Sequence, residues 1–244
     1  MRIDILTLFP EMFAGVLGSS ILKRAAQARA DGSAPVTFHL TNIRDHTDER
    51  HGKVDQAPYG GGPGMVLQCQ PIWDAVAYAE SLDPRPATRI VMIPQGPRMD
   101  QLIVEELAEQ PRLLVIAGHY EGIDERVLHA LEPIHRLSIG DYVVTGGELA
   151  AMVLADAVVR LQPGVLGDAH SVDQESFSRQ MQRGLEHPQY TRPQSWNGMK
   201  VPEILLSGNH AQIQAWQAER GREMTRRSRP DLLDDPASGP MATG

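Results

Sequence analysis

Short apolar runs alternate with stretches of helical spacing through the first two thirds of the chain. Four of the five runs end at, or directly before, a Gly or Pro. Strands and helices that alternate in this way form α/β domains, in which helices cover a mainly parallel sheet. The predicted strands are residues 2–9, 36–40, 89–94, 112–118 and 135–140, and the predicted helices are residues 10–30, 71–82, 99–110, 123–132 and 147–161.

This alternation stops after residue 161. The segment "QPGVLGDAHSVDQESF" is small, polar and acidic, which is typical of a linker, and beyond it we expect only helices, at residues 175–185 and 209–222. At 244 residues the chain is long enough for one large domain or two modest ones. We therefore predict an α/β domain over 1–162, a linker over 163–176, a small helical domain over 177–233 and a disordered tail over 234–244.

Composition indicates an ordinary globular protein. Hydrophobic residues make up 41% of the chain and charged residues 22%, and no apolar run approaches the roughly 20 residues that cross a bilayer. The first residues, "MRIDILTLFPEMF", lack the long apolar stretch of a signal peptide. Cys69 is the only cysteine, which excludes an internal disulfide and a cysteine metal cluster. We expect a cytoplasmic protein without membrane contact.

Charge is unevenly distributed along the chain. Residues 177–230 hold nine Lys and Arg against four Asp and Glu, a net charge of +5. Since the whole chain has a net charge of −8, the remaining residues have a net charge of −13. Five of these cations are arginines within "ERGREMTRRSRP". A basic face on an acidic protein can bind a polyanion. A solvated helix with surface arginines has the same pattern.

A polar, glycine-rich passage over residues 41–71 has no regular pattern, and a loop of that length is usually functional. Its centre, "YGGGPGM", lacks the Lys-Ser/Thr pair of a P-loop, and its glycines do not follow the first strand as in a dinucleotide-binding fold. Two interpretations stay open. The backbone turns tightly against a ligand or a partner chain, or the glycines serve a purely structural turn.

Three strands run into glycine and polar residues before a helix begins. The segments are "IPQGPRMD" (93–100), "IAGHYEGIDE" (116–125) and "LSIGDYVVTGGEL" (137–149). In an open α/β sheet the carboxyl ends of neighbouring strands form the ligand crevice. The three segments together predict a site for one small molecule.

These strings, with "YGGGPGM", "PGVLG", "HPQYTRP" and "VPEILLSGNHAQI", resemble the bacterial tRNA (guanine-N1)-methyltransferases of the TrmD type over residues 2–233. The resemblance implies a SPOUT fold, an α/β domain whose C-terminal part forms a trefoil knot, followed by a small helical domain. It implies a homodimer in which each active site uses both chains. It also implies methyl transfer from S-adenosylmethionine to N1 of guanine 37 in tRNA with guanine at position 36.

The same resemblance implies which residues catalyse the methyl transfer and which bind the donor. Glu175 would be the general base that removes the N1 proton, and Arg160 would stabilise the charge on guanine O6. Glycine backbone and Ile139 suit a thin adenine slot, and Glu121 suits the cationic methionine end of the donor, although it could instead cap the following helix. The donor would be bound by Pro94, Gln95, Gly96, Gly118, Tyr120, Glu121, Ser138, Ile139, Gly140, Tyr142, Val144, Gly146 and Gly147.

The chain departs from the family pattern at three positions. Glu175 replaces the usual Asp base, His119 stands where an Arg is common, and Ala150 where a Pro is common. Two other functions therefore stay open: a non-catalytic RNA-binding module, and a SPOUT enzyme that methylates a ribose or another base. Family members use Mg²⁺, but the sequence shows no isolated carboxylate cluster that would mark a protein-held metal site.

Overall fold

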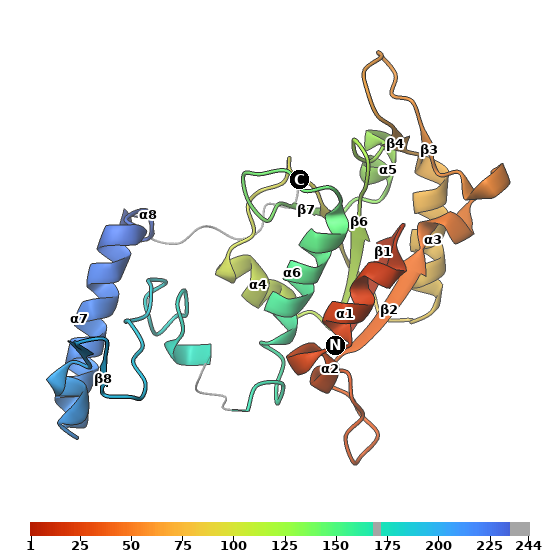
Figure 1. Cartoon of the computed structure of the whole chain (residues 1–244). Helices are drawn as coiled ribbons and strands as arrows, with labels where there is room; N and C mark the ends of the chain where they lie inside the picture. Colours follow the sequence, from red (N-terminus) through yellow and green to blue (C-terminus); the bar gives the residue numbers. More distant parts are fainter. Residues whose placement is uncertain (168–171, 235–244) are drawn as a thin grey trace. The chain divides into compact units, whose positions relative to one another are not determined.

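The computed structural model describes residues 1–167 and 172–234, and a five-stranded parallel sheet forms the centre of the first of its two compact units. The strands lie in the order β2-β1-β6-β5-β7, and every neighbouring pair is parallel. Figure 1 shows β1, β2 and β6 in this unit. The predicted α/β class and all five predicted strands are confirmed. The strands are β1 (Arg2–Thr7), β2 (Thr37–Asn42), β5 (Thr88–Met92), β6 (Arg112–Ala117) and β7 (His135–Leu137).

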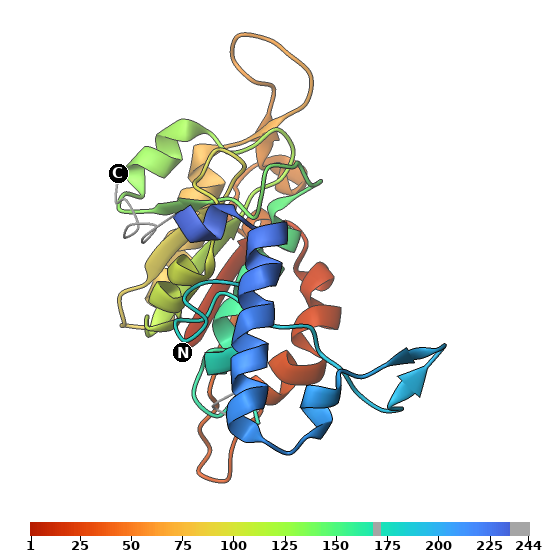
Figure 2. The same ribbon diagram turned by 90° about the vertical axis from the view of Figure 1, so that its left-hand side faces the viewer.

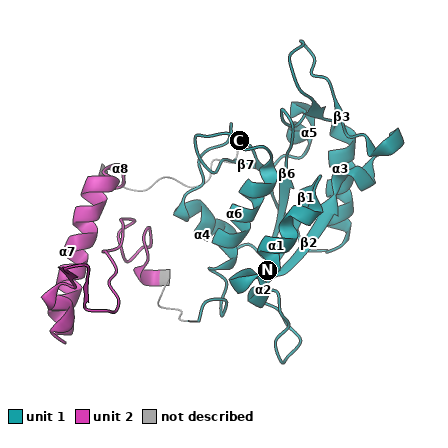
Figure 3. Cartoon of the chain, in the orientation of Figure 1, with its two compact units in different colours: residues 1–167, 240–244 teal, residues 168–239 magenta. Residues whose placement is uncertain are grey.

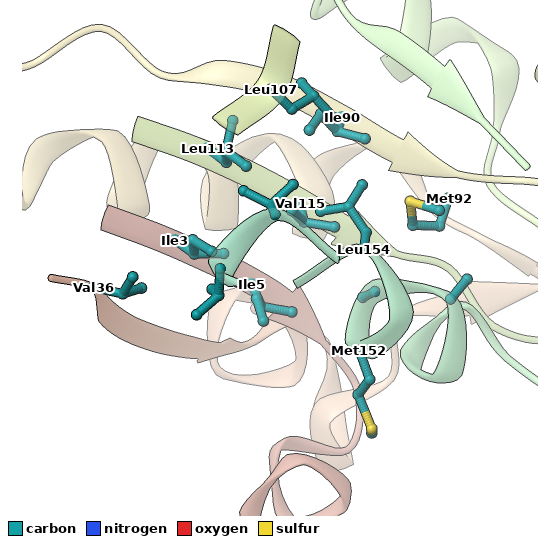
Figure 4. Close-up of a cluster of buried hydrophobic side chains, with 14 of the residues drawn as sticks. Ile3, Ile5, Val36, Ile90, Met92, Leu107, Leu113, Val115, Met152 and Leu154 are labelled. Carbon is teal, nitrogen blue, oxygen red and sulfur yellow. The ribbon is translucent and has the colours of Figure 1, made fainter. Parts of the chain in front are cut away.

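The central strands β1 and β6 are buried along their whole length. Because successive side chains of a strand point to opposite sides, these strands are buried on both faces of the sheet. On β6, Leu113 and Val115 belong to one hydrophobic cluster, and Leu114 and Ile116 belong to the other. Figure 4 shows the first cluster, where Leu154 of the long apolar helix α6 lies among strand residues. The helices of this unit are α1 (Ala14–Leu17), α2 (Ser20–Ala25), α3 (Cys69–Ser81), α4 (Gln101–Ala108), α5 (Glu125–Ala130) and α6 (Gly147–Val159).

Two stretches of the first unit differ from the prediction. The single helix expected over 10–30 is instead a 3-10 turn, η1 (Pro10–Phe13), followed by α1 and α2, because the chain turns at Gly18 and reaches a φ of 48° at Ser20. The passage over 41–71 is not wholly irregular. It contains η2 (Ile43–His46), η3 (Arg50–Gly52) and a short antiparallel ladder of β3 (Asp55–Gln56) with β4 (Val66–Leu67).

The chain divides into two compact units, of which the first ends at Gly167, beyond the predicted end at residue 162 (Figure 3). The described part of the second unit contains η4 (Val172–Gln174), β8 (Ser195–Trp196), β9 (Met199–Lys200), η5 (Glu203–Leu206), α7 (His210–Ser228) and α8 (Asp231–Asp234). The predicted helix over 209–222 is thus confirmed and is longer than expected. Apart from Asp234, the tail predicted over 234–244 lies outside the described residues.

The helix predicted over 175–185 is wrong, and so is the expectation of helices alone. Residues 175–185 form successive turns in which Gln182 and Arg183 have φ values of 51° and 63°. Thr225 of α7 fixes one of these turns, because its Oγ1 accepts a hydrogen bond from the Leu185 backbone N–H at 2.9 Å. The β8–β9 hairpin was also missed, although the Asn197-Gly198 pair at its turn is a strong hairpin signal.

A buried ion cluster lies at the amino end of the sheet. The Asp4 carboxylate is fully buried between Arg2 and Arg112, whose Nε atoms donate to it at 2.9 and 2.8 Å. Arg112 also donates to the backbone carbonyls of Ala79 and Asp83, both at 2.6 Å, at the end of α3. One guanidinium therefore joins β1, β6 and α3.

We predict that Arg112→Met lowers the free energy of unfolding by about 3 kcal/mol, since it removes one partner of a buried ion pair and several donors to buried carbonyls. Urea denaturation measures the change. The control is Arg126→Met, which removes an exposed ion pair with Asp124 and should leave the midpoint unchanged. Equal midpoints for the two variants would contradict the role given to Arg112.

Candidate active site

A cavity of about 340 Å³ opens where β5, β6 and β7 end. These strands are neighbours in the sheet, so the three loops that follow them surround one space, as expected for an α/β ligand crevice. The volume lies within the range of small-molecule sites. The three segments singled out in the sequence are therefore brought together.

Most of the residues predicted to bind the donor line this cavity. The exceptions are Gly96 and Gly140, which belong to the same loops but do not line the cavity. A Cβ on Gly96 would lie 2.6 Å from the backbone of Arg136, so only glycine lets this loop approach β7. Gly140 has a φ of 152°, and a Cβ there would lie 2.5 Å from the Tyr142 ring. The predicted residues that line the cavity are Pro94, Gln95, Gly118, Tyr120, Glu121, Ser138, Ile139, Tyr142, Val144, Gly146 and Gly147.

The start of α6 is in close contact with the end of β6. The Gly147 backbone N–H donates to the Gly118 carbonyl at 2.6 Å, and a Cβ on Gly147 would lie 2.7 Å from the Gly118 nitrogen. Since those neighbours are backbone atoms, a larger residue could fit only if a strand or the helix moved. The backbone at this point sets the wall of the cavity.

A buried acid lies directly behind that wall. Glu148 is fully buried; its Oε1 accepts from Thr7 Oγ1 at 2.9 Å, and its Oε2 lies 3.3 Å from His119 Nδ1. A Cβ on Gly146 would overlap both the His119 ring and the Glu148 carboxylate. His119 itself lines the cavity and packs on Phe9, with ring centroids 4.9 Å apart. This group links β1, the loop after β6 and α6.

Sequence reasoning missed Thr7 and Glu148 and treated His119 only as a departure from the family pattern. The available signal was a Glu in the first turn of a helix that is otherwise apolar, "GELAAMVL". Such an acid is buried only with partners, and it also suits the positive end of the helix dipole.

The glycine-rich loop packs on its own chain. The Glu121 backbone N–H donates to the Met65 carbonyl at 2.9 Å, and a Cβ on Gly64 would overlap the Glu121 carboxylate. Gly64 also has a φ of 81°, a conformation that favours glycine, so this glycine serves a turn that packs within its own chain. Tyr59 at the tip is 98% exposed, so the outer part of the loop has no contact of that kind.

Glu121 is not the cap of the helix that follows. Asp124 caps α5, where its carboxylate accepts from the Arg126 backbone N–H at 3.0 Å. In residues 1–167 and 172–234 the Glu121 carboxylate, which lines the cavity, has no hydrogen-bond or ion-pair partner. Its charge is therefore available to a ligand.

Tyr120 links the cavity to the passage over 41–71. Its hydroxyl accepts from Arg44 Nη2 at 3.0 Å, and its backbone has a positive φ of 59°.

A second, open cavity of about 1310 Å³ lies between that passage and α5, and Glu125 lines both cavities. Cys69 on this wall is a poor nucleophile, because burial and a hydrogen bond to Asp124 raise the pKa of its thiol.

Neither of the two predicted catalytic residues is among those that line the first cavity. Arg160 is the C-terminal cap of α6, roughly 20 Å along the helix from Gly147 at 1.5 Å per residue. Glu175 belongs to the second unit, in a turn where its carbonyl accepts from the Ser178 backbone N–H at 3.1 Å.

Within residues 1–167 and 172–234, no three His, Cys, Asp or Glu side chains gather as a metal site would require. No helix in those residues is long and apolar enough to cross a membrane.

We predict that Gly147→Ala lowers the free energy of unfolding by about 1–3 kcal/mol, because the added methyl group meets fixed backbone atoms. Thermal and urea denaturation measure the loss. Gly15→Ala is the control, since no atom lies within 4 Å of a Cβ built there, and it should be neutral or slightly stabilising. If both alanine variants kept full stability, the contact between α6 and β6 would not be as tight as described.

Comparison with known proteins gives one consistent result. The family model described as "tRNA (Guanine-1)-methyltransferase TrmD" matches residues 1–235. The chain is 52% identical over 235 residues to a tRNA (guanine-N(1)-)-methyltransferase of Bacillus cereus strain G9842, covering 96% of this chain and 93% of that protein. It is 51% identical, with the same coverage, to the enzymes of the same name from Bacillus cereus strain AH820 and Bacillus anthracis strain CDC 684. The chain belongs to the TrmD family of tRNA (guanine-N1)-methyltransferases.

Proposed function

We propose that the chain transfers a methyl group from S-adenosylmethionine to N1 of guanine 37 in tRNA that also has guanine at position 36. The cavity at the ends of β5, β6 and β7 carries this proposal, since it is lined by the strings in which the chain resembles its family. The methyltransferase class follows from family membership. The donor, the guanine position and the residue roles are the proposal.

The chemistry of the cavity suits this donor. Ile139 and Leu137 supply apolar wall for an adenine ring, with glycine backbone on the opposite loops. The carboxylate of Glu121 has no partner in the described chain and can pair with the ammonium group of the methionine part. S-adenosylmethionine supplies an electrophilic methyl group on a sulfonium, so the protein's task is alignment and proton removal.

Two side chains complete the reaction. The carboxylate of Glu175 takes the proton from guanine N1 as N1 forms its bond to the methyl carbon and the carbon–sulfur bond breaks. The Arg160 guanidinium donates to guanine O6, where negative charge develops as the N1 proton leaves. Neither role calls for a covalent intermediate on the protein.

The position of Arg160 supports a homodimer. A cation about 20 Å along α6 from Gly147 is too far to act at its own cavity, so we infer that it acts at the cavity of a second copy. The exposed face of α6 carries apolar side chains that could pack against a second copy of the chain. Leu149 and Val153, one turn apart, are 44% and 47% exposed, and Val143 in the preceding loop is 85% exposed.

The basic second unit would hold the tRNA. On α7, Arg222, Arg226 and Arg227 are exposed, and no hydrogen bond or ion pair of their side chains is found in the described chain. Arg220 is different, since it pairs with Glu219 and Glu223. Exposed arginines bind phosphates and position an RNA, while contacts to bases give selectivity.

We predict that the protein forms N1-methylguanosine at position 37 and that Glu175→Gln slows this transfer by roughly 100-fold. Glutamine keeps the size of the side chain but cannot accept the proton. The measurement is single-turnover transfer of a radiolabelled methyl group, followed by nuclease digestion that separates base-methylated from ribose-methylated nucleosides. Donor affinity, measured by calorimetry, should be the same in the variant and the wild type.

Asp173→Asn is the matched control for this experiment, because it changes another acid of the same segment. Near-normal transfer by Glu175→Gln with loss in Asp173→Asn would identify Asp173 as the base. A ribose-methylated product would show a different SPOUT enzyme, and tRNA binding without any transfer would show a non-catalytic module.

We also predict that two inactive variants restore activity when mixed. Glu121→Gln removes a donor contact but keeps Arg160, and Arg160→Ala does the reverse. In a mixed dimer, one cavity has an intact donor site and faces an intact Arg160, so activity should return to about a quarter of the wild-type level after random exchange of subunits. Activity that stays absent in dimers of proven mixed composition would place Arg160 and the cavity in the same chain.

A further inference from the structure

The β8–β9 hairpin is a small, well-defined projection of the second unit (Figure 2). Trp196 pairs with Met199 across a two-residue turn, Asn197-Gly198, whose φ values of 52° and 76° are those of a tight hairpin turn. The Val201 backbone N–H donates to the Gln194 carbonyl at 3.0 Å and extends the ladder. The backbone therefore holds its side chains in fixed directions.

One face of this hairpin is apolar and uncovered. Trp196 and Met199 lie directly opposite each other, so they share one face, while Ser195 and Lys200 share the other. Trp196 is 66% exposed and Met199 is 59% exposed, and every residue from 189 to 200 is exposed. By contrast, Trp216 on α7 packs against other aromatic side chains of its own unit.

The segment that contains the hairpin carries no negative charge. Residues 187–202 contain no Asp or Glu, and they include the cations Arg192 and Lys200. An exposed aromatic ring with cations near it in the sequence is a combination with which proteins bind unpaired nucleotides, because the ring stacks on a base while long cationic side chains reach the phosphates. The apolar face alone would also fit a partner protein. The absence of acidic residues favours RNA, because acidic residues would repel its phosphates.

We propose that Trp196 stacks on an unpaired base of the tRNA, with Arg192 and Lys200 contacting the adjoining phosphates. This inference rests on the proposed function, since it takes tRNA as the substrate. It assigns the hairpin a base contact that is distinct from the phosphate contacts of α7.

Fluorescence of Trp196 tests the stacking directly. The full-length variant Trp73→Phe/Trp216→Phe keeps Trp196 as its only tryptophan, since the chain has three. We expect tRNA to quench this fluorescence and a fully paired RNA duplex of equal length to leave it nearly unchanged. Equal quenching by the two RNAs would overturn the proposal.

Affinity gives a second readout. Trp196→Ala should weaken tRNA binding about tenfold without a change in its salt dependence, whereas Trp196→Phe should keep most of the affinity. Arg192→Gln/Lys200→Gln should instead lower the slope of log affinity against log salt by about 0.7 for each lost phosphate contact. Donor binding should be unaffected in all three variants.

The outcomes separate this inference from the proposed function. If the wild type binds and methylates tRNA and Trp196→Ala binds it equally well, the inference is refuted and the proposed function stands. If Trp196→Ala changes only the oligomeric state in sedimentation, the apolar face contacts a protein and the inference is again refuted. If the wild type does not bind tRNA at all, the proposed function itself fails.

Discussion

The contact between Gly147 and Gly118 is the constraint on which the rest of the site depends. It brings the first turn of α6 against the end of β6, with the two backbones joined at 2.6 Å. Glu148 lies in that first turn, and its carboxylate is buried between Thr7 and His119. A helix amino terminus favours negative charge, so the helix stabilises the buried acid and the acid in turn holds the loop that carries His119. The cavity wall is thus built from backbone and buried groups, and it leaves Glu121 as the charged side chain that faces a ligand without a partner in the described chain.

Much of the first unit could be predicted from the sequence, for physical reasons. Parallel strands that are buried on both faces read as continuous apolar runs, and "RLLVIAG" and "RIVMIP" are of that kind. In an open α/β sheet the carboxyl ends of neighbouring strands form the ligand crevice, which is why three loops far apart in sequence could be assigned to one site. The observed order places β6, β5 and β7 next to one another. The ion cluster around Asp4 could not be predicted, because it depends on which residues of β1, β6 and α3 meet in space.

The second unit shows where such reasoning fails. Residues 175–185 have helical composition, but their backbone follows contacts with α7, and Gly184 and Gly221 lie where other residues would meet the facing chain. A Cβ on Gly221 would lie 2.8 Å from the Leu185 carbonyl oxygen. Long-range packing therefore overrides local propensity. The hairpin at Trp196 is a different kind of miss, since its turn signal was present in the sequence and only its length, two residues a strand, made it easy to overlook.

The expectation that Glu175 stands in for an Asp of the family pattern has a different meaning once the surroundings of Glu175 are known. In a free linker, the extra methylene could be absorbed by a small shift of the chain. The described segment is instead hydrogen-bonded within the second unit: Ser178 Oγ donates to the Asp173 carbonyl at 2.6 Å, and the Glu186 backbone N–H donates to Ser176 Oγ at 3.1 Å. Because the backbone on both sides of Glu175 is held, the longer side chain must adjust through its own rotamers. A general base is defined by its reach to the proton, and unperturbed Asp and Glu differ by only about 0.4 in pKa. In the proposed mechanism, the turn around Glu175 and the length of its side chain would together set the reach of the proposed base.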